Sequence, residues 1–325
     1  MKNNLNILLF SFLTTIFLLL STKASAQELS LSLTPNLSEI AAKPGRTISL
    51  KFKLTNHGDP TIVNIRILPF EAKDNRGNIN ILSSLQGPIR FELANEDIKL
   101  AEPLFLKNST SRDLLLNIYL PETLANQDYY FTLLAESQPP PAQEGVVNIR
   151  AKALVASNLL LTVTKDGRIE IKPNISLFEV VPKNKINFLG TKINLFNSFE
   201  KIPLIMVVEN QGKYLIKPQG GITVRGMFAQ AKQVEIKPQN ILAESQRVLL
   251  AHSSNLQPQT SNSLLLPGFF MGNYKASATI SFGPGTPTLY ATTSFLVLPL
   301  KAIFIFLPIL FLITLIFKKL SPQKR

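Results

Sequence analysis

The sequence predicts an all-β protein that folds into consecutive β-sandwiches and ends in a single α-helix. Two observations predict the strands: short segments in which apolar and polar residues alternate, and the glycine, proline and asparagine residues between them. A third observation, a long uncharged apolar stretch near the end of the 325-residue chain, predicts the helix.

The first predicted sandwich, residues 27–164, contains the clearest alternation. Over 47–55, apolar residues at 48, 50, 52 and 54 are separated by polar ones, which puts one strand face in a core and the other in water. The turn Lys43–Gly45 precedes this strand. Further strands are predicted at 61–70, 89–93, 113–120, 128–135 and 146–164. The proline-rich segment Ser137–Gly145 is predicted to be the loop joining the last two.

The second predicted sandwich, residues 165–298, repeats this organisation after the turn signal Lys165–Gly167. Strands are predicted at 201–210, 220–228, 232–237, 247–251, 273–282 and 288–298. In both halves an apolar run stops at Asn-x-Gly, at Asn56 and again at Asn210, so we expect the same corner in two related units. With this strand count and spacing, the fold class is two tandem immunoglobulin-like β-sandwiches.

Each half also has tyrosine at the start of a late strand. A hydroxyl at such a position can bond to backbone a few residues upstream, the arrangement called a tyrosine corner. Tyr129 or Tyr130 in the first half, and Tyr274 in the second, are therefore expected to be structural residues.

The two ends of the chain indicate export and membrane anchoring. Residues 1–26 have a charged start, an apolar centre and the small-residue pattern Ala24-Ser25-Ala26, as a signal peptide does. Residues 299–317 are apolar and are predicted to form a transmembrane helix. The basic segment 318–325 that follows predicts a single-pass membrane protein, with its tail in the cytoplasm and the sandwiches outside.

Composition excludes several classes of function. The net charge is +13, but two basic residues fall in the leader and five in the last segment, which leaves 27 basic against 21 acidic residues. They are scattered, with no basic run and no aromatic stripe, so no nucleic-acid partner is expected. The chain has no cysteine, so the sandwiches must be held by apolar burial without disulfides.

No pattern in the chain predicts catalysis, a cofactor or a metal site. His57 and His252 have no ligand pattern nearby and are expected to be solvated. The segment Ala72–Asn80 faintly resembles a calcium loop but lacks alternating acids and a closing glutamate, so a hairpin turn is expected. No catalytic, cofactor-binding or metal residues are therefore assigned, and no ligand-binding residue is identified. A pair of distant carboxylates for glycan cleavage stays open as an alternative.

The order of parts resembles the WxL-interacting protein family of bacterial cell surfaces. The similar residues are Thr34-Pro35, the turn Lys43–Gly45, the strand ending Thr55–Gly58 and the passage 114–130. This resemblance implies a first sandwich that binds peptidoglycan and a second that binds partner proteins.

Three functions are carried forward as hypotheses. The first is a non-catalytic, membrane-anchored surface protein that binds cell-wall polymer or another exported protein. The second is a chaperone-like protein that captures an extended client segment by strand addition, since the strand after Lys43–Gly45 resembles the first sandwich of pilus chaperones. The third is a cell-wall hydrolase with an unrecognised carboxylate pair.

Overall fold

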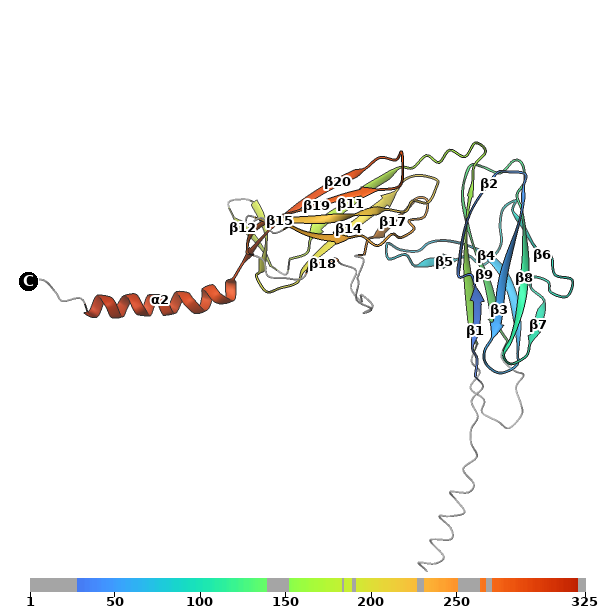
Figure 1. Cartoon of the computed structure of the whole chain (residues 1–325), viewed down its shortest axis with the longest axis horizontal. Coiled ribbons are helices and arrows are strands. Elements are labelled where there is room, and N and C mark those ends of the chain that lie inside the picture. The colour runs from blue at the N-terminus through green and yellow to red at the C-terminus, as the bar shows by residue number, and fades with distance from the viewer. Residues whose placement is uncertain are drawn as a thin grey trace, which may run out of the picture.

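The computed structural model describes residues 28–138, 152–182, 184–188, 191–226, 231–250, 264–266 and 271–320. The predicted leader 1–26, most of the proline-rich loop and His252 lie outside these residues. The described part is all-β apart from the helix α2 (Leu300–Leu320), and its strands form four sheets (Figure 1).

The first two sheets pack into one sandwich. Sheet 1 has the order β1-β3-β8-β6, from β1 (Leu31–Thr34), β3 (Thr47–Asn56), β8 (Thr110–Tyr119) and β6 (Arg90–Leu93). Sheet 2 has the order β2-β10-β9-β4-β5, from β2 (Leu37–Ala42), β10 (Leu154–Val163), β9 (Gln127–Ser137), β4 (Thr61–Ala72) and β5 (Ile79–Ile81), and β7 (Pro103–Leu106) also pairs with β4. The alternation expected at 47–55 is confirmed, because Phe52 and Leu54 are fully buried in the core between these sheets.

The other two sheets pack around a second, separate core. Sheet 3 contains β11 (Pro173–Val180), β14 (Ile202–Asn210), β17 (Ser245–Val248) and the short β18 (Leu264–Leu266). Sheet 4 has the order β12-β13-β20-β19-β15-β16, from β12 (Asn184–Phe188), β13 (Thr191–Asn197), β20 (Leu289–Leu298), β19 (Gly272–Ser281), β15 (Gln219–Gly226) and β16 (Ala231–Glu235). In Figure 1 the strands of the first sandwich run upright, whereas those of the second lie across the picture.

The two sandwiches share one chain path. In the first, β1 pairs with β3 in sheet 1, and the chain then crosses to sheet 2, where β2 runs parallel to the last strand, β10. In the second, β11 pairs with β14 in sheet 3, and β13 later runs parallel to the last strand of sheet 4, β20. The other described strand pairs are antiparallel.

The repeated Asn-x-Gly motif forms the same corner in both sandwiches. Asn56 and Asn210 end the equivalent strands β3 and β14, and both are buried. Each side-chain oxygen accepts a hydrogen bond from the amide of the glycine two residues on, at 3.1 Å and 3.0 Å. Each side-chain nitrogen lies within 3.5 Å of three backbone carbonyls. The corner predicted from the sequence is confirmed.

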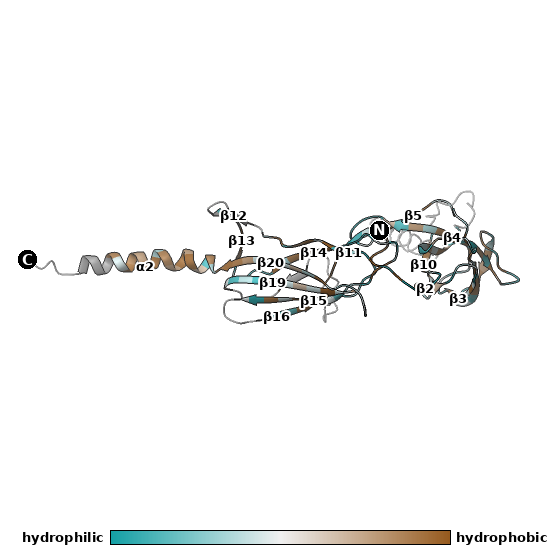
Figure 2. Cartoon of the chain, turned by 90° about the horizontal axis from the view of Figure 1, so that it is seen from above, coloured by the Kyte–Doolittle hydropathy of each residue, from teal (hydrophilic) through white to brown (hydrophobic). Residues whose placement is uncertain are grey.

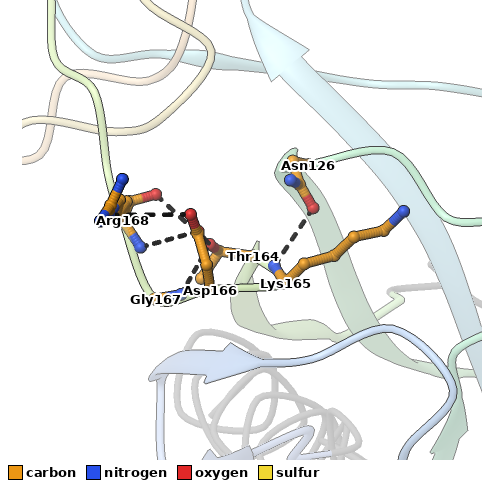
Figure 3. A network of polar contacts seen from close by, with 6 residues as sticks. All are labelled: Asn126, Thr164, Lys165, Asp166, Gly167 and Arg168. Carbon is orange, nitrogen blue, oxygen red and sulfur yellow. Dashed lines mark hydrogen bonds and ion pairs between the residues drawn. The ribbon is translucent and has the colours of Figure 1, made fainter.

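The expected turn at Lys165–Gly167 connects the last strand of the first sandwich to the second (Figure 3). The Thr164 hydroxyl accepts a hydrogen bond from the Gly167 amide, and the Asp166 carboxylate accepts one from the Arg168 amide. The Lys165 amide donates to the side chain of Asn126, which precedes β9. Gly167 has a φ of +79°, the left-handed region that glycine adopts without a steric penalty.

The C-terminal helix forms where it was predicted, but the membrane span is not supported. Helix α2 is apolar over most of its length (Figure 2). Its large apolar side chains between Ile303 and Leu315 are exposed. Within the described part of the chain, however, no helix combines the length and apolarity that crossing a membrane requires. The assignment of 299–317 as a transmembrane helix stays a prediction.

Candidate functional site

A cleft lies between the two sandwiches. Its volume is about 370 Å³. The first sandwich contributes residues of β2, β10 and the β4–β5 hairpin, and the second contributes Lys217 and the segments 238–242 and 245–247. Ten of its nineteen lining residues are polar or charged, and the apolar ones include Leu37, Phe70 and Leu160.

The β4–β5 hairpin joins the two sandwiches at one end of this cleft. The backbone carbonyl of Asn75 accepts a hydrogen bond from the amide of Val248 in β17, at 2.7 Å. The neighbouring Gly77 has a φ of +88°, and a Cβ at this position would lie 2.3 Å from the terminal nitrogen Nη2 of Arg247. The guanidinium of Arg247 therefore packs against a backbone position that only glycine leaves free.

A second contact between the sandwiches is built on a buried carboxylate. Asp128, at the start of β9, is 7% exposed, and its Oδ2 accepts hydrogen bonds from the Leu215 amide and the Tyr130 hydroxyl. The Tyr130 hydroxyl in turn accepts one from the Ala243 amide, at 2.8 Å. Burial raises the pKa of Asp128, and burial together with the Asp128 charge raises the pKa of Tyr130.

The charges that line the cleft are unevenly paired. Glu39 accepts hydrogen bonds from Lys217 and from the Asn240 amide group. The Arg247 guanidinium donates to the Asn240 carbonyl at 2.7 Å, but within the described residues no carboxylate lies at ion-pair distance from it. Burial lowers the pKa of Arg247. In the same part of the chain, Nε of Arg247 and Oδ1 of Asn158 and of Asn240 are buried without a hydrogen-bond partner.

The three side chains that carry these atoms line the cleft. A guanidinium without a counter-charge favours an anionic group, and amide oxygens favour N–H or O–H donors.

The second candidate surface is a half-open strand edge on β10. All ten residues of β10 pair with β9, but β2 pairs only with the six residues Asn158–Val163. The four residues Leu154–Ser157 therefore have no paired strand on the β2 side among the described residues, although the buried Ser157 donates its hydroxyl to the Pro35 carbonyl. They carry no charge, and Leu154 is 57% exposed. We call Leu154–Ser157 the first open edge.

Most other strand edges in the described chain, although not that of β20, are protected in ways common in natural sheets. The protections are a charged residue, a proline, a bulge, or a length of no more than four residues. They occur at Arg90 and Glu92 in β6, Glu39 in β2, Pro103 in β7, Pro173 and the bulge after Ile175 in β11, Lys185 in β12, Lys232 and Glu235 in β16, Arg247 in β17, and in the short β1, β5 and β18. The first open edge carries no charge, no proline and no bulge.

The structure shows the surroundings of His57 and of the 72–80 segment. His57 is exposed, and its Nε2 lies 2.9 Å from the hydroxyl of Ser32. The 72–80 segment is the β4–β5 hairpin, as expected, and its Asp74 carboxylate accepts hydrogen bonds from Arg76 and Asn78. Those bonds, led by the one from the Asn78 side chain, lower the pKa of Asp74.

The tyrosine expectation is also confirmed. The Tyr129 hydroxyl donates to the Ala125 carbonyl at 3.3 Å, which is the upstream bond of a tyrosine corner. The Tyr274 hydroxyl also meets upstream backbone, but as acceptor from the Met271 amide, at 3.1 Å.

One sequence-based expectation about strand capture stays a prediction, and one feature was missed. The strand after Lys43–Gly45 is β3, and β1 pairs only with its residues Lys53–Asn56, so Thr47–Phe52 have no strand partner on that side within the described residues. The first strand of each sandwich, β1–β2 and β11, was not predicted, although its position decides which later edge stays open. The available signal was the alternation of Leu31 and Leu33, and the lack of charge from Ala153 to Val163.

Comparison with known proteins finds structural similarity alone. No protein-family model and no curated protein sequence matches the chain. Similar solved structures include a chaperone–tip adhesin complex of CFA/I fimbriae, with 11% identity over 81% of this chain and 98% of that one and a TM-score of 0.38. The Escherichia coli chaperone DraB has 14% identity over 82% and 98%, with a TM-score of 0.36. The Salmonella enterica SafA pilin–SafB chaperone complex has 10% identity over 83% and 99%, with a TM-score of 0.35.

The fold assignment depends on the strand pairings and the two buried cores of this chain. The resemblance to the WxL-interacting family, the binding of wall polymer and the hydrolase alternative stay predictions.

Proposed function

We propose that this protein is a non-catalytic binding protein that acts outside the cytoplasm and captures an extended segment of another exported protein. The segment would add as a strand to the first open edge, Leu154–Ser157. The observation that carries the proposal is the register of sheet 2, in which β2 covers six of the ten residues of β10.

The backbone at this edge supports strand addition. An unpaired strand edge offers a row of amides and carbonyls to an incoming chain, which supplies affinity without a particular sequence. The side chains would set selectivity. Val155 is partly buried and packs against the first core, whereas Leu154 points to the other face and is exposed. An apolar, uncharged client segment fits both faces.

The open edge and the cleft are adjacent, which favours a client segment that reaches both. Asn158 is the first residue of β10 that pairs with β2, and it also lines the cleft. A segment laid along the first open edge would thus end beside the cleft, where the Arg247 guanidinium has no acidic partner.

Hydrogen–deuterium exchange on the full chain tests the proposal. The probe is an acetylated and amidated ten-residue peptide of alternating valine and threonine between terminal lysines. We expect it to slow amide exchange at Leu154 and Ala156, whose backbone groups face the open side, because added strands protect the amides to which they bond.

The substitution Val155→Lys places a charge facing inward at the open edge, and we expect it to weaken peptide binding at least tenfold. The matched control is Phe91→Lys, since Phe91 is also a partly buried edge-strand residue that packs against the first core, but in the charged strand β6. Equal losses of peptide affinity in the two variants would contradict strand capture at this edge. So would amide exchange in the wild type that the peptide leaves unchanged.

A further inference from the structure

The second sandwich has its own half-open edge, formed by its last strand. Residues Leu289–Val297 of β20 pair with β19, whereas β13 pairs only with Leu296–Leu298. The seven residues Leu289–Phe295 therefore have no backbone partner on the β13 side within the described part of the chain. This second open edge results from the same chain path that leaves β10 half open, and it is longer.

The second open edge also lacks the protections of the other edges. Its sequence, LYATTSF, contains no charge, no proline and no glycine. No bulge interrupts its register with β19. The neighbouring edge of the same sheet, β16, carries Lys232 and Glu235. Natural sheets that avoid edge pairing charge, bend or shorten their edges, so an uncharged regular edge of this length is suited to receive a strand.

The side chains at this edge specify the chemistry of the strand that fits. Leu289 and Ala291 point inward, are partly buried and pack against the second core. Ile175 and Phe178 of β11, a strand of sheet 3 in contact with β20, are likewise partly buried against that core. On the other face, Tyr290 is 73% exposed, and Thr292 and Ser294 are exposed.

We infer that the second sandwich is a second strand-binding site, at Leu289–Phe295, for an uncharged extended segment with apolar residues on one face and hydroxyl-bearing or aromatic residues on the other. A strand in this position would extend sheet 4 and cover Leu289 and Ala291. The ligand class follows from the proposed function of the first open edge, but the site depends only on the register of β13 and β20.

Calorimetric titration of the full chain with the same valine–threonine peptide tests the inference. The expected stoichiometry is two peptides per chain, with slowed amide exchange in both Leu154–Ser157 and Leu289–Phe295. Ala291→Lys should remove one site. The matched control is Val234→Lys in the charged edge β16, because Val234 is also partly buried against the second core.

A second variant leaves the core untouched. The chain has no cysteine, so Tyr290→Cys creates a single thiol on the exposed face of the second open edge. A peptide of the same pattern with a central cysteine, activated as its thionitrobenzoate mixed disulfide, should react with it at least tenfold faster than with Gln233→Cys on exposed β16.

The outcomes separate the two proposals. If one peptide binds per chain and amide exchange is slowed only in Leu154–Ser157, the second site is overturned and the proposed function stays intact. Protection confined to Leu289–Phe295 would support the second site and overturn capture by β10. Binding at neither edge, or equal trapping rates in the two cysteine variants, would overturn the second site.

Discussion

At the scale of single residues, the two buried asparagines stabilise the corners of the sandwiches. Asn56 and Asn210 each satisfy a glycine amide and several carbonyls that no solvent reaches. A side chain that cannot form these bonds leaves buried backbone groups without partners, at a cost of about 1–3 kcal/mol for a group.

We therefore expect Asn210→Ala to lower the free energy of unfolding by at least about 2 kcal/mol, and Asn56→Ala to do the same. The measurement is urea denaturation followed by circular dichroism. The control is Asn108→Ala, whose exposed side chain bonds only to its neighbour Ser109 and which should change stability by no more than about 0.5 kcal/mol. A loss at Asn210 as small as at Asn108 would show that the corner is not stabilising.

At the scale of strands, a glycine of β15 packs against the ring of a tyrosine in β19. Gly226 pairs with Tyr274, and a Cβ at position 226 would lie 2.2 Å from the tyrosine ring. The ring of Tyr274 also stacks on Phe295 of β20, with centroids 5.6 Å apart. The absence of a side chain at Gly226 thus allows three neighbouring strands to pack around one ring.

Gly226→Ala should destabilise the protein by about 1–3 kcal/mol, because the ring must move and its packing on Phe295 is lost. In the Tyr274→Ala background, the methyl group added at position 226 meets no ring, so Gly226→Ala should lower the free energy of unfolding much less. A double-mutant cycle from urea unfolding measures this coupling. Additive effects of the two substitutions would contradict the packing described.

The strands also show how far sequence reasoning extends. The alternation over 47–55 predicted β3 because strict period-two burial follows from the geometry of one strand. The partner of each strand edge was not predictable in the same way. Strand β2 covers only part of β10 because the chain crosses between the sheets just before Leu37. Where β2 then lies depends on its pairing with residues of β10, more than a hundred positions away in the sequence.

At the scale of the whole molecule, several contacts fix the sandwiches against each other. Among them are the hairpin contact of Asn75 with Val248, the ion pair of Glu39 with Lys217, and the network around Asp128. The exposed ion pair contributes little, since surface pairs are typically worth less than about 1 kcal/mol. The buried Asp128 network is therefore the contact most sensitive to substitution.

Asp128 makes stability depend on pH with a defined sign. Its pKa is raised by burial, so the folded state binds a proton more tightly than the unfolded state does. This contribution favours folding below about pH 3.8, the ordinary pKa of the group, and is lost as the pH rises through the raised folded value.

We expect Asp128→Asn to become progressively more stable relative to the wild type as the pH rises through that window. The asparagine oxygen can still accept from the Leu215 amide. Urea unfolding of both proteins between pH 4 and pH 7 measures the difference between their free energies of unfolding. Carboxylates with a lowered pKa, such as Glu136, contribute with the opposite sign but equally in both proteins, so their contribution cancels in this difference. A difference independent of pH would contradict the assignment.

The sequence alone determined the β class of this protein, most of its inner strands and the repeated corner at Asn56 and Asn210, because alternation and turn chemistry act over a few residues. Only the tertiary structure decided that β10 and β20 are each left half uncovered and that a cleft lies beside one of them. The physical reason is that a strand edge stays open where the neighbouring strand pairs with only part of it, and that neighbouring strand is distant in sequence.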